Sequence, residues 1–461
     1  MIVRTMLMRS YVLVALASAS ISVSQCAGQD FAKQIESLAK PYVDSETVTG
    51  LSVGVVKAGQ TTQVHLGKTS ASGETPDPDT VYEIGSASKV FTGILLGDAV
   101  VRGDVQLDQA AQELLPPSVT MPKGKQREIK LIDLSTHMSG LPRLPDNMPS
   151  LTSKDPYADY TSKLAYAFLN SHQLIREPGA KQEYSNFAAS LLGQLLCQKA
   201  GKSYDELLAE RITVPLGMAD TRVELNASMK SRLATPHDSS GSVDSNWGFA
   251  DMPGAGGIRS TTTDMLKFAQ ACLETPDNPT GKAIEMAWKE HYAGGRGEAK
   301  MGLGWHFAGD GSTRWHNGQT GGYHSMVMVN RQLGSAVVVL TNTSTMEVDQ
   351  LAGDVIRMLA GAKMQPRMFD AAVKVTPEKM QRLVGRYQLA PTFIFDVSVK
   401  NGKLMVGVTN QPTHQVFAKS DTEWFYKVVD ATLTFDVDNN GKCNSLVLFQ
   451  NGVRQTAKRI K

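Results

Sequence analysis

Hydrophobic residues recur at helical spacing in some segments of the chain and alternate with polar residues in others. Residues 31–38 have helical spacing that stops before Pro41, as expected because the residue before a proline avoids helical geometry. Residues 51–56 and 63–66 predict two strands, and residues 90–101 place their apolar side chains on one face of a further helix.

The middle of the chain, about residues 105–250, predicts helices separated by loops marked by proline and glycine, with little strand signal. Strands are expected again later, followed by a helix: residues 302–307, 324–330 and 335–341, then 347–359. This order predicts an α/β fold of the α+β kind, in which an antiparallel sheet is flanked by helices and a helical subdomain is inserted.

The pattern changes after residues 361–373, which read as a linker. Beyond it, short alternating segments are separated by two-residue hairpin signals, at Asn401-Gly402, Asn440-Gly441 and Asn451-Gly452. The sequence therefore predicts a main domain over 29–360 and a small all-β domain, barrel-like by preference, over 374–461.

Residues 1–28 differ from the rest and predict a signal peptide. They have a basic start, an apolar run over 11–23 and small residues just before Gln29, where cleavage is expected. The alternatives are a membrane anchor that stays attached, disfavoured by the short apolar run, and a lipoprotein at Cys26, disfavoured by bulky Gln25. We expect an exported protein, periplasmic or secreted, with no other span.

Composition narrows the classes of function. A net charge of +2 over 461 residues gives no reason to expect a nucleic-acid or anionic-membrane partner. Without the first 28 residues the cysteines are Cys197, Cys272 and Cys443, which make neither a disulfide framework nor a paired metal spacing. No His-Glu-x-x-His segment or dense His/Asp cluster supports a zinc hydrolase. We expect no metal and no cofactor.

Ser86-Ala87-Ser88-Lys89 lies where a strand over 81–84 passes through Gly85 into a helix. Residues three apart share a helix face, so the amine of Lys89 can reach the hydroxyl of Ser86. The helix N-terminus favours the negative charge that develops there, and a lysine kept neutral by burial and cationic neighbours can take the proton. Ser86 is the predicted nucleophile and Lys89 its base.

Two later segments strengthen this prediction. Tyr184-Ser185-Asn186 lies in a loop before a helix; its phenol can relay a proton to a leaving group, and its amide can hold a substrate carbonyl or the lysine. His316-Asn317-Gly318-Gln319 lies on or beside a strand that can pair with an extended substrate and donate a backbone N–H to an oxyanion. Alone, each segment has a structural explanation, but their combination and order favour a catalytic site.

Other segments match nucleophile patterns by coincidence. Ser37 and Lys40 repeat the Ser-x-x-Lys spacing on the exposed side of a helix. Ser52 lies in a literal Gly-x-Ser-x-Gly, but that elbow needs a helix after its strand, and here the strand continues. His65-Leu66-Gly67 fits His-x-Gly but precedes Ser86 in a strand, and we interpret it as structural.

Together these segments resemble the serine β-lactamases and penicillin-binding proteins, on the side of class C β-lactamases, DD-peptidases and their esterase relatives. Further supporting phrases are residues 134–142, 215–218, 254–260 and 302–305. The resemblance covers about residues 30–360, and the tail resembles the β-barrel appendage that some relatives carry. It implies acyl transfer to water at Ser86, from a β-lactam or a D-alanyl-type peptide amide, with a small-molecule or peptidoglycan-derived substrate.

The resemblance also implies roles for individual residues. Tyr184 would be the proton relay and Asn186 a substrate ligand, and the backbone N–H groups of Ser86 and Gln319 would form the oxyanion hole. Two alternatives stay open: a carboxylesterase that cleaves small acyl esters with the same residues, and a wall- or ligand-binding module that keeps the fold without the chemistry.

The third segment departs from the pattern of the family. Class C β-lactamases usually have Lys-Thr-Gly where this chain has His316-Asn317-Gly318. Asn317 replaces a hydroxyl residue that helps to hold a carboxylate, which leaves the substrate open. A histidine at this place titrates near neutral pH, so we expect protonated His316 to bind a substrate carboxylate. The alternative is a histidine that packs beside Trp315 and donates a neutral hydrogen bond.

Overall fold

The computed structural model describes residues 30–149, 153–369, 372–400, 402–409, 411, 413–427, 429 and 431–460. The predicted signal peptide lies outside these residues, so export stays a prediction. In the part of the chain that is described, we find no helix of the length and hydrophobicity that a membrane crossing requires. Cys197, Cys272 and Cys443 are buried free thiols.

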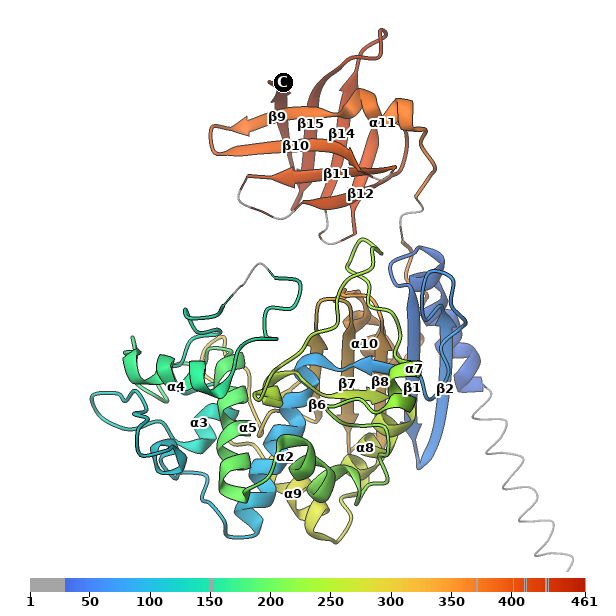
Figure 1. The fold of residues 1–461 in the computed structure, drawn as a ribbon. Coiled ribbons are helices and arrows are strands. Elements are labelled where there is room, and N and C mark those ends of the chain that lie inside the picture. The colour runs from blue at the N-terminus through green and yellow to red at the C-terminus, as the bar shows by residue number, and fades with distance from the viewer. Residues whose placement is uncertain are drawn as a thin grey trace, which may run out of the picture.

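A six-stranded sheet organises the larger part of the molecule (Figure 1). Its strands, in sheet order, are β2 (Gln60–Gly67), β1 (Gly50–Lys57), β8 (Ser335–Thr341), β7 (His324–Asn330), β6 (Thr313–Gln319) and β5 (His306–Phe307). All neighbouring pairs are antiparallel, and β1 joins the two ends of this part of the chain by pairing with β2 and β8. The predicted antiparallel sheet is confirmed.

Alternation along the central strand β8 separates two hydrophobic clusters, because successive side chains point to opposite faces. Val337 packs in a cluster with the helix over residues 30–44 and with α10 (Glu347–Leu359). Val338 packs on the other face in the cluster that contains α8 (Thr262–Glu274). Helices therefore cover both faces of the sheet, as predicted (Figure 1).

The inserted subdomain is mostly helical. Its elements are α2 (Ser88–Val101), α3 (Leu131–Ser135), α4 (Ser162–Ser171), α5 (Asn186–Ala200), α6 (Tyr204–Leu208), α7 (Ala227–Arg232), α9 (Pro279–Trp288) and the short pair β3 (Val81–Glu83) and β4 (Arg259–Thr261). The first eleven residues of α2 are buried, so this helix has no solvent face over its first three turns. It packs between α5 and α9 and forms the core of the subdomain.

The strand predicted over residues 302–307 is wrong for most of its length. Only His306 and Phe307 form a strand, and Gly302–Gly304 form a turn. Gly304 has a φ of +71°, a left-handed conformation that favours glycine, and a Cβ there would lie 2.3 Å from the carbonyl oxygen of Lys89. The turn thus packs on the backbone of α2, a close contact that alternation in the sequence does not reveal.

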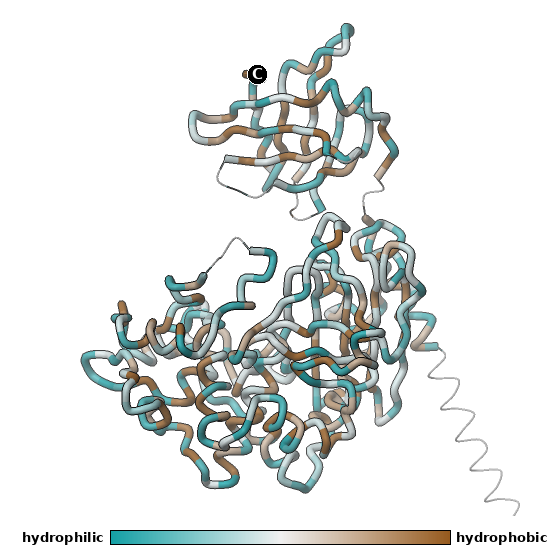
Figure 2. Tube along the Cα trace, in the orientation of Figure 1, coloured by the Kyte–Doolittle hydropathy of each residue, from teal (hydrophilic) through white to brown (hydrophobic). Residues whose placement is uncertain are grey.

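A closed eight-stranded antiparallel barrel follows, as predicted. Its elements are α11 (Pro377–Leu383), β9 (Gly385–Ala390), β10 (Phe393–Lys400), β11 (Lys403–Val408), β12 (His414–Ala418), β13 (Glu423–Tyr426), β14 (Ala431–Val437), β15 (Cys443–Gln450) and β16 (Val453–Arg459). Hydrophobic and polar residues alternate along these strands (Figure 2). Asn451 and Gly452, with φ of 52° and 76°, form the tight turn between β15 and β16 that the sequence signals.

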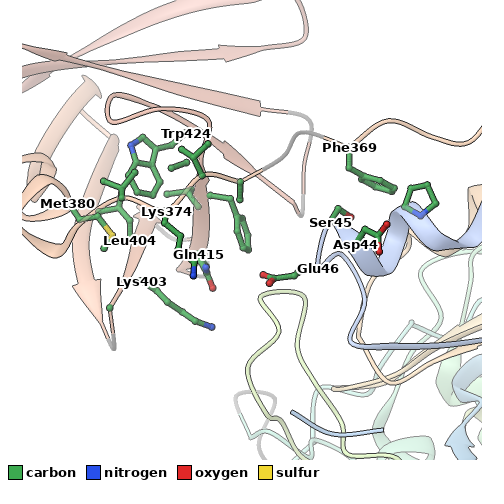
Figure 3. A pocket seen from close by; sticks show the side chains of 18 residues that line it. Asp44, Ser45, Glu46, Phe369, Lys374, Met380, Lys403, Leu404, Gln415 and Trp424 are labelled. Carbon is green, nitrogen blue, oxygen red and sulfur yellow. The ribbon is translucent and has the colours of Figure 1, made fainter. Parts of the chain in front are cut away.

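The barrel meets the rest of the molecule at the end of the helix over residues 30–44. Lys427 of the barrel donates a hydrogen bond to the carbonyl oxygen of Ser45, and its burial lowers its pKa to about 8. A cleft of about 660 Å³ lies between the two parts, with Met380, Leu404 and Trp424 on the barrel side (Figure 3). The connection is therefore small and largely open.

Because that connection is small, we propose that the two parts fold separately. A protein truncated after Ala362 should stay folded and should still be acylated at Ser86 by a small ester. Intact-protein mass spectrometry and a thermal melt compare it with the full chain. Absence of both a cooperative melting transition and the acylation would show that residues beyond 362 are needed for folding and that the boundary is misplaced. Those residues include Arg367, which pairs with Glu347, and Phe369, which packs on Tyr42, as well as the barrel.

Candidate active site

Ser86 lies in a tight turn between β3 and α2. The turn is a 3₁₀ helix over Gly85–Ala87, and Gly85 has a φ of +50°. A Cβ at Gly85 would lie 2.6 Å from the backbone nitrogen of Gln319, so glycine is required both by conformation and by the close approach of β6. The turn leaves Ser86 partly exposed at the N-terminal end of a buried helix.

Lys89 lies one helical turn further, and its side chain is only 3% exposed. Its Nζ lies 3.0 Å from Ser86 Oγ and 2.7 Å from the carbonyl oxygen of Ala255. Burial, reinforced by the charge of Arg143, places the pKa of Lys89 well below 10.5. The structure thus holds an amine with reduced proton affinity in hydrogen-bonding contact with a serine hydroxyl.

Tyr184 comes from the loop before α5 and contacts the same pair. Its ring centroid is 4.9 Å from Lys89 Nζ. Burial raises the pKa of Tyr184 to about 12, although interaction with the Ser86 side chain opposes this shift. At neutral pH Tyr184 is therefore a phenol, able to donate a proton.

Asn186 begins α5 beside Tyr184, but its amide is not directed to Lys89. Its Nδ2 donates to the hydroxyl of Tyr157 at 2.9 Å, while its Oδ1 is buried without a hydrogen-bond partner among the described residues. Lys89 instead bonds to the carbonyl of Ala255. Of the two contacts predicted for Asn186, the one to the lysine is absent among the described residues. A substrate carbonyl could be held only by Nδ2, which already donates to Tyr157, whereas the free Oδ1 is an acceptor for a donor group.

Strand β6 runs directly beside the Ser86 turn. A Cβ at Gly318 would lie 2.0 Å from the carbonyl oxygen of Ile84 and 2.7 Å from the nitrogen of Ser86. This contact brings the end of β6, with the backbone N–H of Gln319, against the backbone N–H of Ser86. The side chain of Gln319 is exposed and donates to Ser344 Oγ at 2.8 Å, so only its backbone faces the turn.

The surroundings of His316 disfavour the positive charge that we expected for it. The ring is 1% exposed, and burial, with His306 and Lys89 nearby, places its pKa well below 6.5. Its Nδ1 hydrogen-bonds to the carbonyl oxygen of Asn317. These surroundings favour a neutral, hydrogen-bonded His316, as in the alternative, although the ring that stacks on Trp315 is that of His306. The burial of His316 could not be inferred from its neighbours in the sequence.

Asn317 points toward the helix on the outer face of the sheet. Its Nδ2 donates to Asp349 of α10 at 2.7 Å, and the same carboxylate bonds to His324 Nε2, also at 2.7 Å. Because adjacent residues in a strand face opposite sides, Asn317 cannot share the face of His316 and Gly318. This arrangement does not support the predicted contact between the Asn317 side chain and substrate.

Three residues at the site were not singled out from the sequence. The His137 ring packs against Tyr184 at a tilt, with ring centroids 4.4 Å apart, and the ring centroid of His306 lies 5.0 Å from that of His316. The guanidinium of Arg143 lies 5.1 Å from the Tyr184 ring centroid. His137 lies within the segment 134–142, and Arg143 directly follows it. That segment supports the family resemblance, but its sequence does not indicate which side chains reach Tyr184.

The structure also places the two rival serines. Ser52 is fully buried in β1, where its Oγ bonds to Tyr82 and to His65, each at 2.9 Å. Ser37 is exposed on its helix, and Lys40 forms an ion pair with Asp44 instead. Neither serine has an activating lysine, in agreement with the structural interpretation of both.

The fold and this arrangement match a known family. The Beta-lactamase family profile matches residues 35–362, most of the chain, and a domain of unknown function, DUF3471, matches residues 370–458, which form the barrel. The chain therefore belongs to the Beta-lactamase family. The predicted resemblance is confirmed, and with it the enzyme class of serine hydrolase at the level of the family.

Individual relatives include both peptidases and β-lactamases. The D-alanyl-D-alanine-carboxypeptidase/endopeptidase AmpH of Escherichia coli (strain K12) is 31% identical over 229 residues, 49% of this chain and 58% of AmpH. A β-lactamase of Pseudomonas fluorescens is 26% identical over 280 residues, 60% of this chain and 74% of that protein. The matched region thus spans little more than half the length of AmpH.

Solved structures show the same fold. The crystal structure of a β-lactamase/D-alanine carboxypeptidase from Yersinia pestis complexed with citrate has a TM-score of 0.62 at 24% identity, covering 72% of this chain and 97% of that one. A class C β-lactamase from Rhodobacter sphaeroides has a TM-score of 0.60 at 21% identity, covering 71% and 99%. Neither match includes the whole chain.

The close contact at Gly318 gives a test of the site geometry. Gly318→Ala should lower kcat for a small ester by about a hundredfold, because the added methyl group must push β6 away from the Ser86 turn and separate the two N–H groups. Gly309→Ala is the matched control, since nothing lies within 4 Å of a Cβ there. Steady-state kinetics and thermal melts of both variants would be compared. Undiminished kcat in Gly318→Ala would contradict the arrangement.

Proposed function

We propose that this protein is a serine hydrolase that forms an acyl-enzyme at Ser86 and hydrolyses β-lactam or D-alanyl-type peptide amide bonds. The observation that carries the proposal is the contact between Ser86 Oγ and the buried Nζ of Lys89, at 3.0 Å. An amine in that position with a lowered pKa is a base of the kind that activates a serine.

In the acylation step, Lys89 takes the hydroxyl proton while Ser86 Oγ attacks the substrate carbonyl carbon. The carbonyl oxygen gains negative charge, and the backbone N–H groups of Ser86 and Gln319 stabilise it. Tyr184 donates its phenolic proton to the leaving nitrogen, which needs a neutral phenol, in keeping with the raised pKa of Tyr184. The phenol then recovers a proton from Lys89, whose Nζ lies near the Tyr184 ring.

Hydrolysis completes the cycle. A water molecule gives up a proton to the same basic groups and attacks the acyl carbon, and Ser86 leaves with a proton returned to its oxygen. Because acylation and deacylation use the same residues, the ratio of the two rates decides between turnover of a β-lactam and lasting inhibition by it.

The relatives support an amide substrate of either kind. AmpH is named a D-alanyl-D-alanine-carboxypeptidase/endopeptidase, and the relative from Pseudomonas fluorescens is named a β-lactamase. We accordingly propose a peptidoglycan-derived or β-lactam substrate, met outside the cytoplasm after removal of the predicted signal peptide. Asn186 Oδ1, buried and unpaired among the described residues, is an acceptor suited to a substrate N–H.

A carboxylesterase is the second candidate, and one observation favours it. His316 is neutral and Asn317 is bound to Asp349, so the third segment presents no cation to a substrate carboxylate. This segment therefore gives no reason of its own for the site to prefer an anionic substrate over a neutral ester.

The nucleophile is tested by covalent labelling. Ser86→Ala should abolish labelling by a mechanism-based acylating agent, whereas Ser37→Ala and Ser52→Ala should leave it intact, because neither serine contacts a lysine amine. Intact-protein mass spectrometry measures the adduct. Labelling that persists in Ser86→Ala would refute the assignment.

A substrate panel separates the candidate functions in the same experiment. The wild-type protein is offered a fluorescent penicillin, a chromogenic cephalosporin, a D-alanyl-D-alanine peptide and a chromogenic ester. Ester turnover without cephalosporin or peptide turnover would select the esterase. No adduct and no turnover with any compound would select the non-catalytic binding module.

A further inference from the structure

Arg143 is exposed beside Tyr184, on a segment that is hydrogen-bonded to the residues after Tyr184. Its carbonyl oxygen accepts hydrogen bonds from the backbone N–H groups of Asn186 and Phe187, at 3.1 and 3.2 Å. The carbonyl oxygen of Pro142, one residue earlier, accepts from Ser185 Oγ at 2.7 Å. Three hydrogen bonds therefore fix the backbone at Pro142 and Arg143 relative to the three residues that follow Tyr184.

The charged end of Arg143 rests on the ring of Tyr184. The guanidinium carbon lies 5.1 Å from the ring centroid, a cation–π distance, while the residue as a whole is exposed. Stacking on a ring face leaves the N–H edge of a guanidinium free, and that edge matches both oxygens of a carboxylate. The ring thus orients the side chain without using its donors.

No carboxylate neutralises Arg143 within the part of the chain that is described. The acid closest to Tyr184 in sequence, Glu183, is paired with Arg176 at 2.6 Å. The groups on which the charge of Arg143 acts are Lys89, His137, Tyr157 and Tyr184, none of which is an anion at neutral pH. Arg143 is therefore a positive charge without a counter-ion beside the reacting residues.

Neighbouring basic groups cannot take this place. His316 is buried and neutral, and Lys89 is enclosed with its hydrogen bonds directed to Ser86 and Ala255. Arg143 is instead an exposed cation in contact with Tyr184, and its carbonyl oxygen bonds to the backbone of Asn186, the residue that carries the unpaired acceptor Oδ1. The Arg143 guanidinium can donate to a carboxylate, and Asn186 Oδ1 can accept from an amide N–H. Together these two groups suit a substrate that carries both.

We propose that Arg143 is the specificity-determining residue that binds a substrate carboxylate, in place of the third segment of the family pattern. The proposal rests on the proposed acylation of Ser86. It predicts that the enzyme prefers anionic over neutral substrates of the same size, and that this preference depends on Arg143 and not on His316.

The test compares matched pairs of esters that differ only in a carboxylate. Phenyl acetate and 3-carboxyphenyl acetate carry the difference on the leaving group; phenyl butyrate and phenyl hemisuccinate carry it on the acyl chain. In at least one pair, Arg143→Ala should lower the anionic-to-neutral ratio of kcat/KM about tenfold, chiefly through KM, since a charge-assisted contact is removed. Arg143→Lys should restore part of the ratio.

The control variant is Arg102→Ala, which removes an exposed arginine at the far end of α2 that pairs with Asp104 at 3.2 Å. It should leave the ratio unchanged and so excludes a general effect of net charge. The wild-type ratio should also stay constant between about pH 6 and 8, because a guanidinium remains charged there, whereas a histidine-based preference would fall.

The outcomes separate the two proposals. An unchanged ratio in Arg143→Ala, with neutral esters still turned over, overturns the role of Arg143 and leaves the acyl-enzyme standing. Absence of any Ser86 adduct in the wild-type protein with all four esters overturns the proposed function itself.

Discussion

The chemistry of this site depends on the enclosure of one amine. Lys89 is buried in the first turn of α2, where its Nζ contacts only Ser86 Oγ and the carbonyl oxygen of Ala255 as hydrogen-bond partners among the described residues. An ammonium group loses much of its hydration in such a place, which favours the neutral base. Two elements beside α2 contribute to this enclosure: the turn at Gly304 covers the backbone of α2, and β6 packs against the residues just before it.

Burial also sets the protonation state of the histidine and tyrosine side chains around Lys89. His137, His306 and His316 lie close together near Tyr184, and burial lowers the pKa of each, to about 4 for His306. Burial raises the pKa of Tyr184 in the opposite sense, because the phenolate is the charged form. The groups around Tyr184 inside the site are thus neutral, and the positive charge beside them is that of the exposed Arg143.

Much of the fold and of the reacting residues could be predicted from the sequence. The turn into α2, the spacing of Ser86 and Lys89, and the Asn-Gly hairpins of the barrel are local features, determined by residues next to one another. The errors concern contacts between distant segments. The pattern over 302–307 predicted a strand, but Gly304 packs on α2, a contact with residues far away in the sequence. The protonation of His316 likewise depends on burial and on groups distant in the sequence, such as Lys89. Arg143 was missed because a single arginine in a loop has no pattern.

The proton affinity of Lys89 is the most direct test of this account. Selective ¹³C labelling of lysine Cε, with the Lys89 signal assigned by its loss in Lys89→Arg, allows the amine to be titrated by NMR in the full-length protein. We expect Lys89 to lose its proton well below the range of the exposed lysines, whose pKa values lie at about 10.4. Titration of Lys89 together with those exposed lysines would contradict the claim that burial makes it the base for Ser86.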